Sequence, residues 1–85
     1  PIGEIMNILI TGGCGFIGSH LVDRFVNQDF KVRVVDDLSA GSLKNIEQHI
    51  HSKNFEFIKG DLRDMDIVGR ALKDIDVVFH LAANP

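Results

Sequence analysis

The apolar residues of this chain fall into four short runs that predict buried β-strands. Each run is too short for a helix, is rich in Ile, Val or Phe, and is followed by Gly or by polar residues. The predicted strands span residues 7–11, 31–36, 54–59 and 77–81. Their nearly continuous apolar character is typical of parallel strands that are covered on both faces.

Between these runs, apolar residues recur at helical spacing. Residues 16–27 and 64–72 each predict an amphipathic helix, and Asp64 is expected to be the N-cap of the second one. Residues 43–51 predict a shorter helix. The side chains expected to face the core are Ile17, Leu21, Val22, Phe25 and Val26 in the first helix, and Ile67, Val68, Ala71 and Leu72 in the second.

Strands and helices therefore alternate along the whole chain. This order predicts an α/β fold in which parallel strands are joined by right-handed crossovers, with helices on both faces. The expected architecture is the first half of a Rossmann-type doubly wound sheet, with strand order 3-2-1-4. In that order the strand at residues 77–81 forms an open edge.

A glycine-rich stretch joins the first predicted strand to the first predicted helix. It reads Gly12-Gly-Cys-Gly15-Phe-Ile-Gly18. In this position Gly12 allows a tight turn, Gly15 lets a pyrophosphate approach the backbone, and Gly18 lets the helix pack closely. Free N–H groups near Phe16 and Ile17, together with the helix dipole, would attract the diphosphate. The stretch therefore predicts the phosphate loop of a dinucleotide site.

An acidic residue follows at the spacing expected for a ribose ligand. Asp36 ends the second predicted strand, 18 residues after Gly18, and a carboxylate in this region accepts hydrogen bonds from the adenosine ribose. Its charge would repel a 2′-phosphate, which favours NAD over NADP. Asp37 doubles the negative charge, and we expect one of the two to point to solvent or to cap the next turn. Arg33 and Lys44 leave an NADP-binding variant open.

The ends of the third and fourth strands complete this edge of the sheet. Asp61 follows the third strand, where adenine lies in a 3-2-1-4 sheet, and could accept a hydrogen bond from its amino group, with Leu62 against the ring. A helix-capping role for Asp61 is the competing interpretation. The small residues at 81–83 would let the dinucleotide cross the sheet closely. His80 is interpreted as a packed or hydrogen-bonded histidine rather than a catalytic group.

Composition narrows the classes of function. Apolar residues make up 45% of the 85 residues, charged residues 25%, and the net charge is −3, all ordinary for a globular domain. The basic surface typical of nucleic-acid binding is missing, and so is an apolar run that could cross a bilayer. We therefore expect neither nucleic acid nor a membrane as a partner. We expect the protein to be cytoplasmic. Residues 1–5 do not resemble a signal peptide and are expected to be a cloning remnant or a short extension.

Several residues with chemical potential are interpreted as structural. Cys14 is the only cysteine and is interpreted as a small residue that fills a loop position rather than as a reactive thiol. His49 and His51 have no accompanying zinc ligands and are expected at the surface, so no metal site is predicted. The chain contains no Tyr, which excludes a mechanism that uses a tyrosine of these 85 residues.

Four stretches together resemble the extended short-chain dehydrogenase/reductase family, most closely its NAD-dependent sugar-nucleotide epimerases and dehydratases of the UDP-glucose 4-epimerase type. They are residues 11–18 (TGGCGFIG), 35–41 (VDDLSAG), 60–64 (GDLRD) and 78–83 (VFHLAA). The stretches lie at the ends of all four predicted strands. Asp37 departs from the pattern, because epimerase-like members usually have Asn there.

The resemblance implies NAD as the cofactor and assigns residues to its parts. Phe16 and Ile17 would meet the pyrophosphate, and residues 36–41 would surround the adenosine ribose. Asp61 and Leu62 would flank adenine, and residues 81–83 would lie along the nicotinamide-side ribose. The cofactor-binding residues expected from the motifs and the resemblance are Gly12, Gly15, Phe16, Ile17, Gly18, Asp36, Asp37, Leu38, Ser39, Gly41, Asp61, Leu62, Leu81, Ala82 and Ala83.

The resemblance also implies a function. Residues 6–85 would be the N-terminal part of the NAD-binding domain of a sugar-nucleotide epimerase, which transfers a hydride transiently at a sugar carbon and acts as a homodimer when full length. An NAD-dependent dehydratase or decarboxylase and a non-catalytic NAD-binding module remain alternatives. The family's catalytic Ser/Thr and Tyr-x-x-x-Lys have no counterpart in these 85 residues. No catalytic residue is assigned here, and the chain alone is expected to be inactive.

Overall fold

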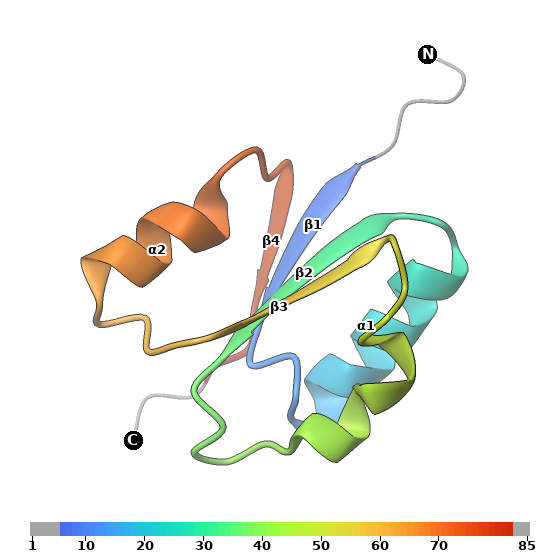
Figure 1. Cartoon of the computed structure of the whole chain (residues 1–85), viewed down its shortest axis with the longest axis horizontal. Helices are drawn as coiled ribbons and strands as arrows, with labels where there is room; N and C mark the ends of the chain where they lie inside the picture. The colour runs from blue at the N-terminus through green and yellow to red at the C-terminus, as the bar shows by residue number, and fades with distance from the viewer. Residues whose placement is uncertain (1–5, 83–85) are drawn as a thin grey trace.

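A computed structural model describes residues 6–82 of the chain. These residues form one parallel four-stranded sheet with the order β3-β2-β1-β4, and helices α1 and α2 lie on opposite sides of it (Figure 1). The α/β fold and the strand order predicted from the sequence are both confirmed. The expected extension at residues 1–5 and the expected site residue Ala83 lie outside the described residues.

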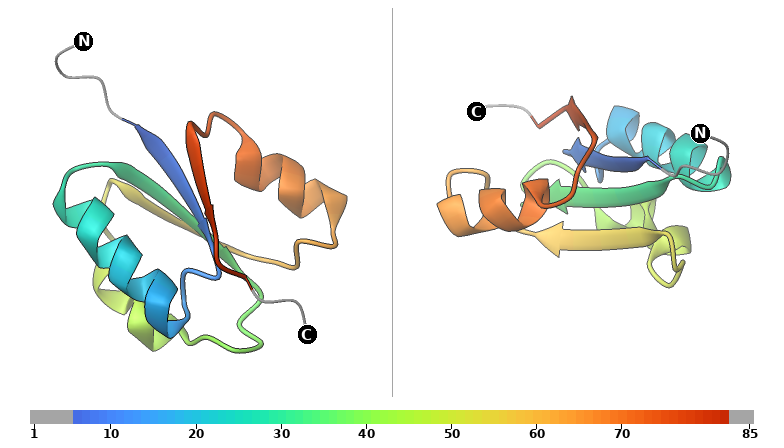
Figure 2. Two further views of the ribbon diagram at one scale, coloured as in Figure 1. Left: turned by 180° about the vertical axis from the view of Figure 1, so that it is seen from behind. Right: turned by 90° about the horizontal axis from the view of Figure 1, so that it is seen from above.

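The strands bring the candidate site residues to one edge of the sheet. They are β1 (Asn7–Thr11), β2 (Lys31–Asp36), β3 (Phe55–Lys59) and β4 (Val77–His80). Because all strand pairs are parallel, their C-terminal ends meet at the same edge (Figure 2). Strand β4 ends one residue earlier than predicted, although the Leu81 N–H still donates to the carbonyl oxygen of Thr11 at 3.1 Å.

Two α-helices and two short 3₁₀ helices connect the strands. Helix α1 spans Phe16–Asn27 and α2 spans Met65–Leu72. Asp64 caps α2 as predicted, because its Oδ1 accepts the Asp66 N–H at 2.9 Å. The single helix predicted over residues 43–51 is wrong: this segment forms two 3₁₀ helices, η1 (Leu43–Asn45) and η2 (Glu47–His49).

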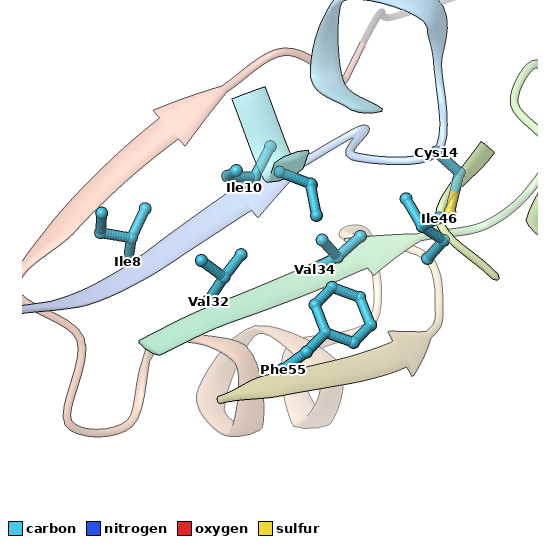
Figure 3. Packing of buried hydrophobic residues seen from close by; sticks show 8 residues of the cluster. Ile8, Ile10, Cys14, Val32, Val34, Ile46 and Phe55 are labelled. Carbon is cyan, nitrogen blue, oxygen red and sulfur yellow. The ribbon is translucent and has the colours of Figure 1, made fainter. Parts of the chain in front are cut away.

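Each face of the sheet has its own apolar core, because successive side chains of a strand point to opposite faces. On the α1 face, Ile10 and Val34 are fully buried with Val22 of α1 and Ile46 of the 3₁₀ segment (Figure 3). On the α2 face the core is smaller and consists of Leu9, Val35, Ile58 and Ala71.

Two side chains expected in the helix stripes lie outside these cores. Ile17 is 66% exposed at the start of α1, and Leu72 is 49% exposed at the end of α2. Both residues sit in a terminal turn of their helix, beyond the part that the sheet covers. No helix within residues 6–82 is long and apolar enough to span a membrane.

The α2 face keeps a hollow beside the edge strand β4. Its volume is about 190 Å³. It lies between α2 and strands β1 and β4, and Val78 on β4 is 44% exposed next to it. The lining residues are Leu9, Thr11, Leu62, Val68, Ala71, Leu72, Val78 and His80.

Candidate functional site

The end of β1 is tied to the end of β4 by one buried hydroxyl. Thr11 Oγ1 accepts the backbone N–H groups of Leu81 at 3.0 Å and of Ala82 at 3.2 Å, and it lies 2.7 Å from Nδ1 of His80. Since the two N–H groups take its lone pairs, the hydroxyl proton is donated to Nδ1. His80 is therefore hydrogen-bonded, as predicted, although its ring is exposed rather than packed.

The glycines of residues 12–18 are under different steric and conformational constraints. Gly12 has a φ of +70°, a conformation that side chains disfavour. A Cβ on Gly13 would lie 2.7 Å from the γ-carbons of Val34, and one on Gly18 would lie 2.3 Å from the carbonyl oxygen of Gly12. A Cβ on Gly15 would meet only that same oxygen, at 3.4 Å. The fold itself therefore tolerates a side chain at Gly15, and the open space there faces outward.

The N-terminus of α1 has no side-chain cap. Gly15 is the N-cap residue, and the first turn contains no acidic residue. Within residues 6–82, the N–H groups of Phe16, Ile17 and Gly18 have no hydrogen-bond acceptor. These unpaired donors and the positive end of the helix dipole form the kind of site that binds phosphate.

A hollow of about 350 Å³ lies in front of this helix end. Phe16 and Ile17 flank it and are 78% and 66% exposed. Two adjacent exposed apolar side chains beside a hollow form a patch, which supports a ligand surface. The residues that line the hollow are Gly12, Gly15, Phe16, Ile17, Gly18 and Leu81.

Asp36 connects the glycine-rich stretch to the loop that follows β2. The residue is only 9% exposed. Its Oδ2 accepts the N–H of Cys14 at 2.9 Å, and its Oδ1 accepts the N–H of Leu38 at 2.8 Å. Each carboxylate oxygen has a further lone pair, so the group can still accept hydrogen bonds from a pair of hydroxyls. The structure thus places the predicted ribose ligand beside the phosphate loop.

Cys14 is a core residue. Its side chain is fully buried and packs in the α1-face core (Figure 3). Burial raises the pKa of the thiol to about 12, with a further contribution from the charge and hydrogen bond of Asp36. The thiol is therefore protonated at neutral pH, which supports the structural interpretation, but the residue does more than fill a variable loop position.

The loop after β2 packs directly on the backbone of Cys14. The Cys14 carbonyl oxygen accepts the N–H of Ser42 at 3.1 Å and the side-chain amide of Asn45 at 2.8 Å. A Cβ on Gly41 would lie 2.6 Å from the carbonyl carbon of Cys14. Gly41 therefore permits a close contact between two loops, a role that no local sequence signal reveals. The bond from Asn45 also ties η1 to the glycine-rich stretch.

Asp37 turns away from the glycine-rich stretch. Its carboxylate is exposed, and Oδ1 accepts the N–H of Ser39 at 2.9 Å and its hydroxyl at 2.7 Å. These hydrogen bonds lower the pKa of Asp37. The residue points to solvent and closes the following turn, as expected for one of the two neighbouring acids.

Asp61 is held by the residue two positions later. Its carboxylate accepts hydrogen bonds from the backbone and the guanidinium of Arg63, and these lower its pKa to about 2. The competing interpretation of Asp61 as the helix cap is wrong, because Asp64 caps α2. Leu62 packs partly against the core of the α2 face.

Arg33 is not available for a 2′-phosphate. Its guanidinium forms an ion pair with Glu56 at 2.8 Å and donates to the carbonyl oxygens of Arg70, Ala71 and Lys73 at the C-terminus of α2. The NADP-binding alternative therefore loses one of the two cations that suggested it.

The predicted surface position of His49 is wrong. Its side chain is buried, and its Nε2 lies 2.6 Å from Asp23 Oδ1 on α1. The residue joins η2 to α1, a contact between positions 26 apart in the sequence. Within residues 6–82, no group of three or more His, Cys, Asp or Glu side chains is arranged to hold a metal ion.

Residues 9–85 match the sequence profile of the family described as GDP-mannose 4,6 dehydratase. The chain is 44% identical over 82 residues to a trifunctional UDP-glucose 4,6-dehydratase/UDP-4-keto-6-deoxy-D-glucose 3,5-epimerase/UDP-4-keto-L-rhamnose-reductase of Arabidopsis thaliana, which covers 91% of this chain and 12% of that protein. It is also 44% identical over 79 residues to the UDP-glucose 4-epimerase of Mycolicibacterium smegmatis. This match covers 92% of this chain and 25% of that protein.

The fold is also similar to solved structures. A dTDP-glucose 4,6-dehydratase from Bacillus anthracis in complex with NAD superposes with a TM-score of 0.86 at 33% identity, covering 93% of this chain and 27% of that one. The chain thus spans about an eighth to a quarter of the length of the two curated relatives.

Proposed function

Because the chain belongs to the GDP-mannose 4,6-dehydratase family of extended short-chain dehydrogenases/reductases, we propose that residues 6–85 are the N-terminal part of the NAD-binding domain of a sugar-nucleotide enzyme. The observation that carries the proposal is the uncapped start of α1. Three unpaired N–H groups face a hollow that the glycine-rich stretch keeps free of side chains. This arrangement fits a pyrophosphate in both charge and space.

The other residues expected to bind the cofactor are proposed to contact the remaining parts of NAD. Asp36 is fixed by two backbone N–H groups and retains acceptor capacity for the adenosine ribose. Leu38, Ser39 and Gly41 form the loop that would enclose that ribose, and Asp61 follows β3 on the adenine side. Leu81 and Ala82, held by Thr11, would lie along the nicotinamide-side ribose.

The whole protein is proposed to be an NAD-dependent nucleotide-sugar epimerase. Bound NAD would supply the acceptor for a hydride from a sugar carbon, and this chain's residues would bind and orient it. The loop at residues 36–41 supports the epimerase branch. The matched family profile supports a dehydratase instead, and a decarboxylase would share the same oxidation step. We further propose a cytoplasmic homodimer that acts on a nucleotide sugar.

The proposed NAD site is tested by side chains added at two glycines. In the whole protein, Gly15→Val should weaken NAD binding at least about a hundredfold, because the new side chain enters the space for the pyrophosphate. Gly69→Val is the matched control, because a Cβ on Gly69 meets nothing within 4 Å. Titration calorimetry measures the affinities, and circular dichroism checks that both variants fold. NAD binding by Gly15→Val at the wild-type affinity would contradict the proposal.

The reaction itself is tested by product analysis of the whole protein with NAD. UDP-glucose should give its 4-epimer, whereas a 4,6-dehydratase would give a 4-keto-6-deoxy sugar. Release of carbon dioxide from UDP-glucuronic acid would identify a decarboxylase. Binding of NAD without turnover of any nucleotide sugar would identify a non-catalytic NAD-binding module.

A further inference from the structure

The carboxylate of Asp61 is held by three donor groups of a single residue, Arg63. The backbone N–H of Arg63 donates to Oδ1 at 2.8 Å. The side-chain Nε–H lies 3.1 Å from Oδ1 and 3.0 Å from Oδ2, and Nη2 donates to Oδ2 at 2.6 Å. These contacts form a guanidinium–carboxylate fork, a geometry that fixes the plane of the carboxylate as well as its position.

This arrangement leaves one acceptor position free. An ionised carboxylate offers about four lone-pair sites, two on each oxygen. The three donor groups of Arg63 supply three protons, and the one on Nε is shared between the two oxygens, so the carboxylate retains capacity for one further donor. The side chain of Asp61 is 37% exposed, whereas that of Arg63 is 90% exposed. Asp61 therefore keeps one accessible acceptor in an orientation that Arg63 sets.

We propose that Arg63 is a positioning residue that aims Asp61 at the exocyclic amino group of adenine, so that the site selects adenine over a base with a carbonyl at that position. The inference rests on the proposed binding of NAD. A carboxylate that is ionised and has no proton to donate can accept a hydrogen bond from an amino group, but it repels a carbonyl oxygen. Arg63 thus makes the exposed carboxylate of Asp61 selective for one nucleobase.

The charges around Asp61 support a fixed, ionised acceptor. Asp37 on the neighbouring loop interacts electrostatically with both Asp61 and Arg63. Without a cation between them, two acids would repel each other at the adenine end of the site. Because Arg63 lowers the pKa of Asp61 to about 2, the acceptor is fully ionised at neutral pH, and preference for adenine should not change from about pH 5 to about pH 8.

The test compares two dinucleotides that differ only at this position of the base. Dissociation constants are measured for NAD and for nicotinamide hypoxanthine dinucleotide, using the whole protein. The wild type should bind NAD roughly tenfold more tightly, as expected for one hydrogen bond to a charged acceptor. Arg63→Ala should lose most of this preference, mainly through weaker binding of NAD. Arg63→Lys, which keeps the charge but not the fork, should retain part of it.

Arg70→Ala is the matched control, because it removes another exposed arginine from the same helix–loop unit and should leave the preference intact. An equal loss of affinity for both dinucleotides in Arg63→Ala would mean a general structural role and would overturn the inference, as would an unchanged preference. If the wild type binds both dinucleotides equally, only this inference fails. If a folded wild type binds neither, the proposed NAD site fails with it.

Discussion

Cys14 is the residue on which the contacts of the phosphate loop converge. Its N–H is bound by Asp36, its carbonyl oxygen is bound by Ser42 and Asn45, and its side chain is in the core. The sequence identifies Asp36 and the glycines through their spacing. It does not reveal this clamp, because Asp36 and Asn45 lie 22 and 31 positions from Cys14 and no local pattern links them to it.

The buried thiol of Cys14 should resist alkylation in the folded protein. With a pKa of about 12 and no solvent access, it should react with iodoacetamide at pH 8 more than about a hundredfold more slowly than in denaturant. Mass spectrometry of the labelled protein at successive times measures both rates. Reaction of the native protein at the denatured rate would show that the loop opens freely.

The buried acid Asp36 should determine the preference for NAD over NADP. Asp36→Asn removes the charge that would repel a 2′-phosphate while it nearly preserves the shape, so the ratio of the two dissociation constants should fall about tenfold. Asp29→Asn is the matched control, because Asp29 is an exposed acid in the turn before β2, and Asn tolerates its φ of +66°. Binding titrations of both variants measure the ratio. Tighter binding of NADP than NAD by the wild type would contradict the assignment.

At the scale of elements, the bounds of a helix or strand were predicted best where the apolar pattern was long and strong. Strands β1 and β2 and helix α1 have the predicted bounds, and a Gly or polar residue directly follows each of them. The segment 43–51 has Leu43, Ile46 and Ile50 at helical spacing, yet only Ile46 is buried. Its residue Asn45 donates a hydrogen bond to the carbonyl oxygen of Cys14, a contact that periodicity cannot show. The same limit applies to His49, whose partner Asp23 belongs to another helix.

Helix α2 should depend on an arginine from a neighbouring strand. The guanidinium of Arg33 binds three carbonyl oxygens at the C-terminus of α2, and its side chain is only 20% exposed. Arg33→Met should therefore lower the free energy of unfolding by about 1–3 kcal/mol. Arg70→Met is the control, because it changes an exposed arginine of the same helix. Denaturant unfolding of the whole protein measures both, and equal effects would contradict the capping role.

At the scale of the molecule, the two faces of the sheet are unequally covered. The α1 face has a continuous core that includes the 3₁₀ segment. The α2 face keeps a hollow beside β4, which is an edge strand of the described sheet. The sequence predicted this edge from the strand order. An edge strand with an exposed apolar side chain tends to pair with another chain.

The 85-residue chain by itself should therefore self-associate in a concentration-dependent manner. Val78→Lys should reduce this association, because a charged residue on an edge strand opposes pairing. Ile50→Lys is the matched control, because Ile50 is 38% exposed in the loop after η2. Sedimentation velocity with and without NAD measures the mass distribution. A stable wild-type monomer with a cooperative unfolding transition would contradict the prediction.

The long-range hydrogen bonds of the glycine-rich stretch also determine when, during translation, this part of the fold can be completed. The glycines leave the ribosome early, but the amide of Asn45 that holds the loop follows Cys14 by 31 residues, and the N–H of Leu81 that binds Thr11 follows by 70. The proposed dinucleotide site is therefore not complete until β4 has emerged. A nascent chain captured before that point should have no affinity for the cofactor. Binding of the cofactor then favours the finished fold over all shorter folding intermediates.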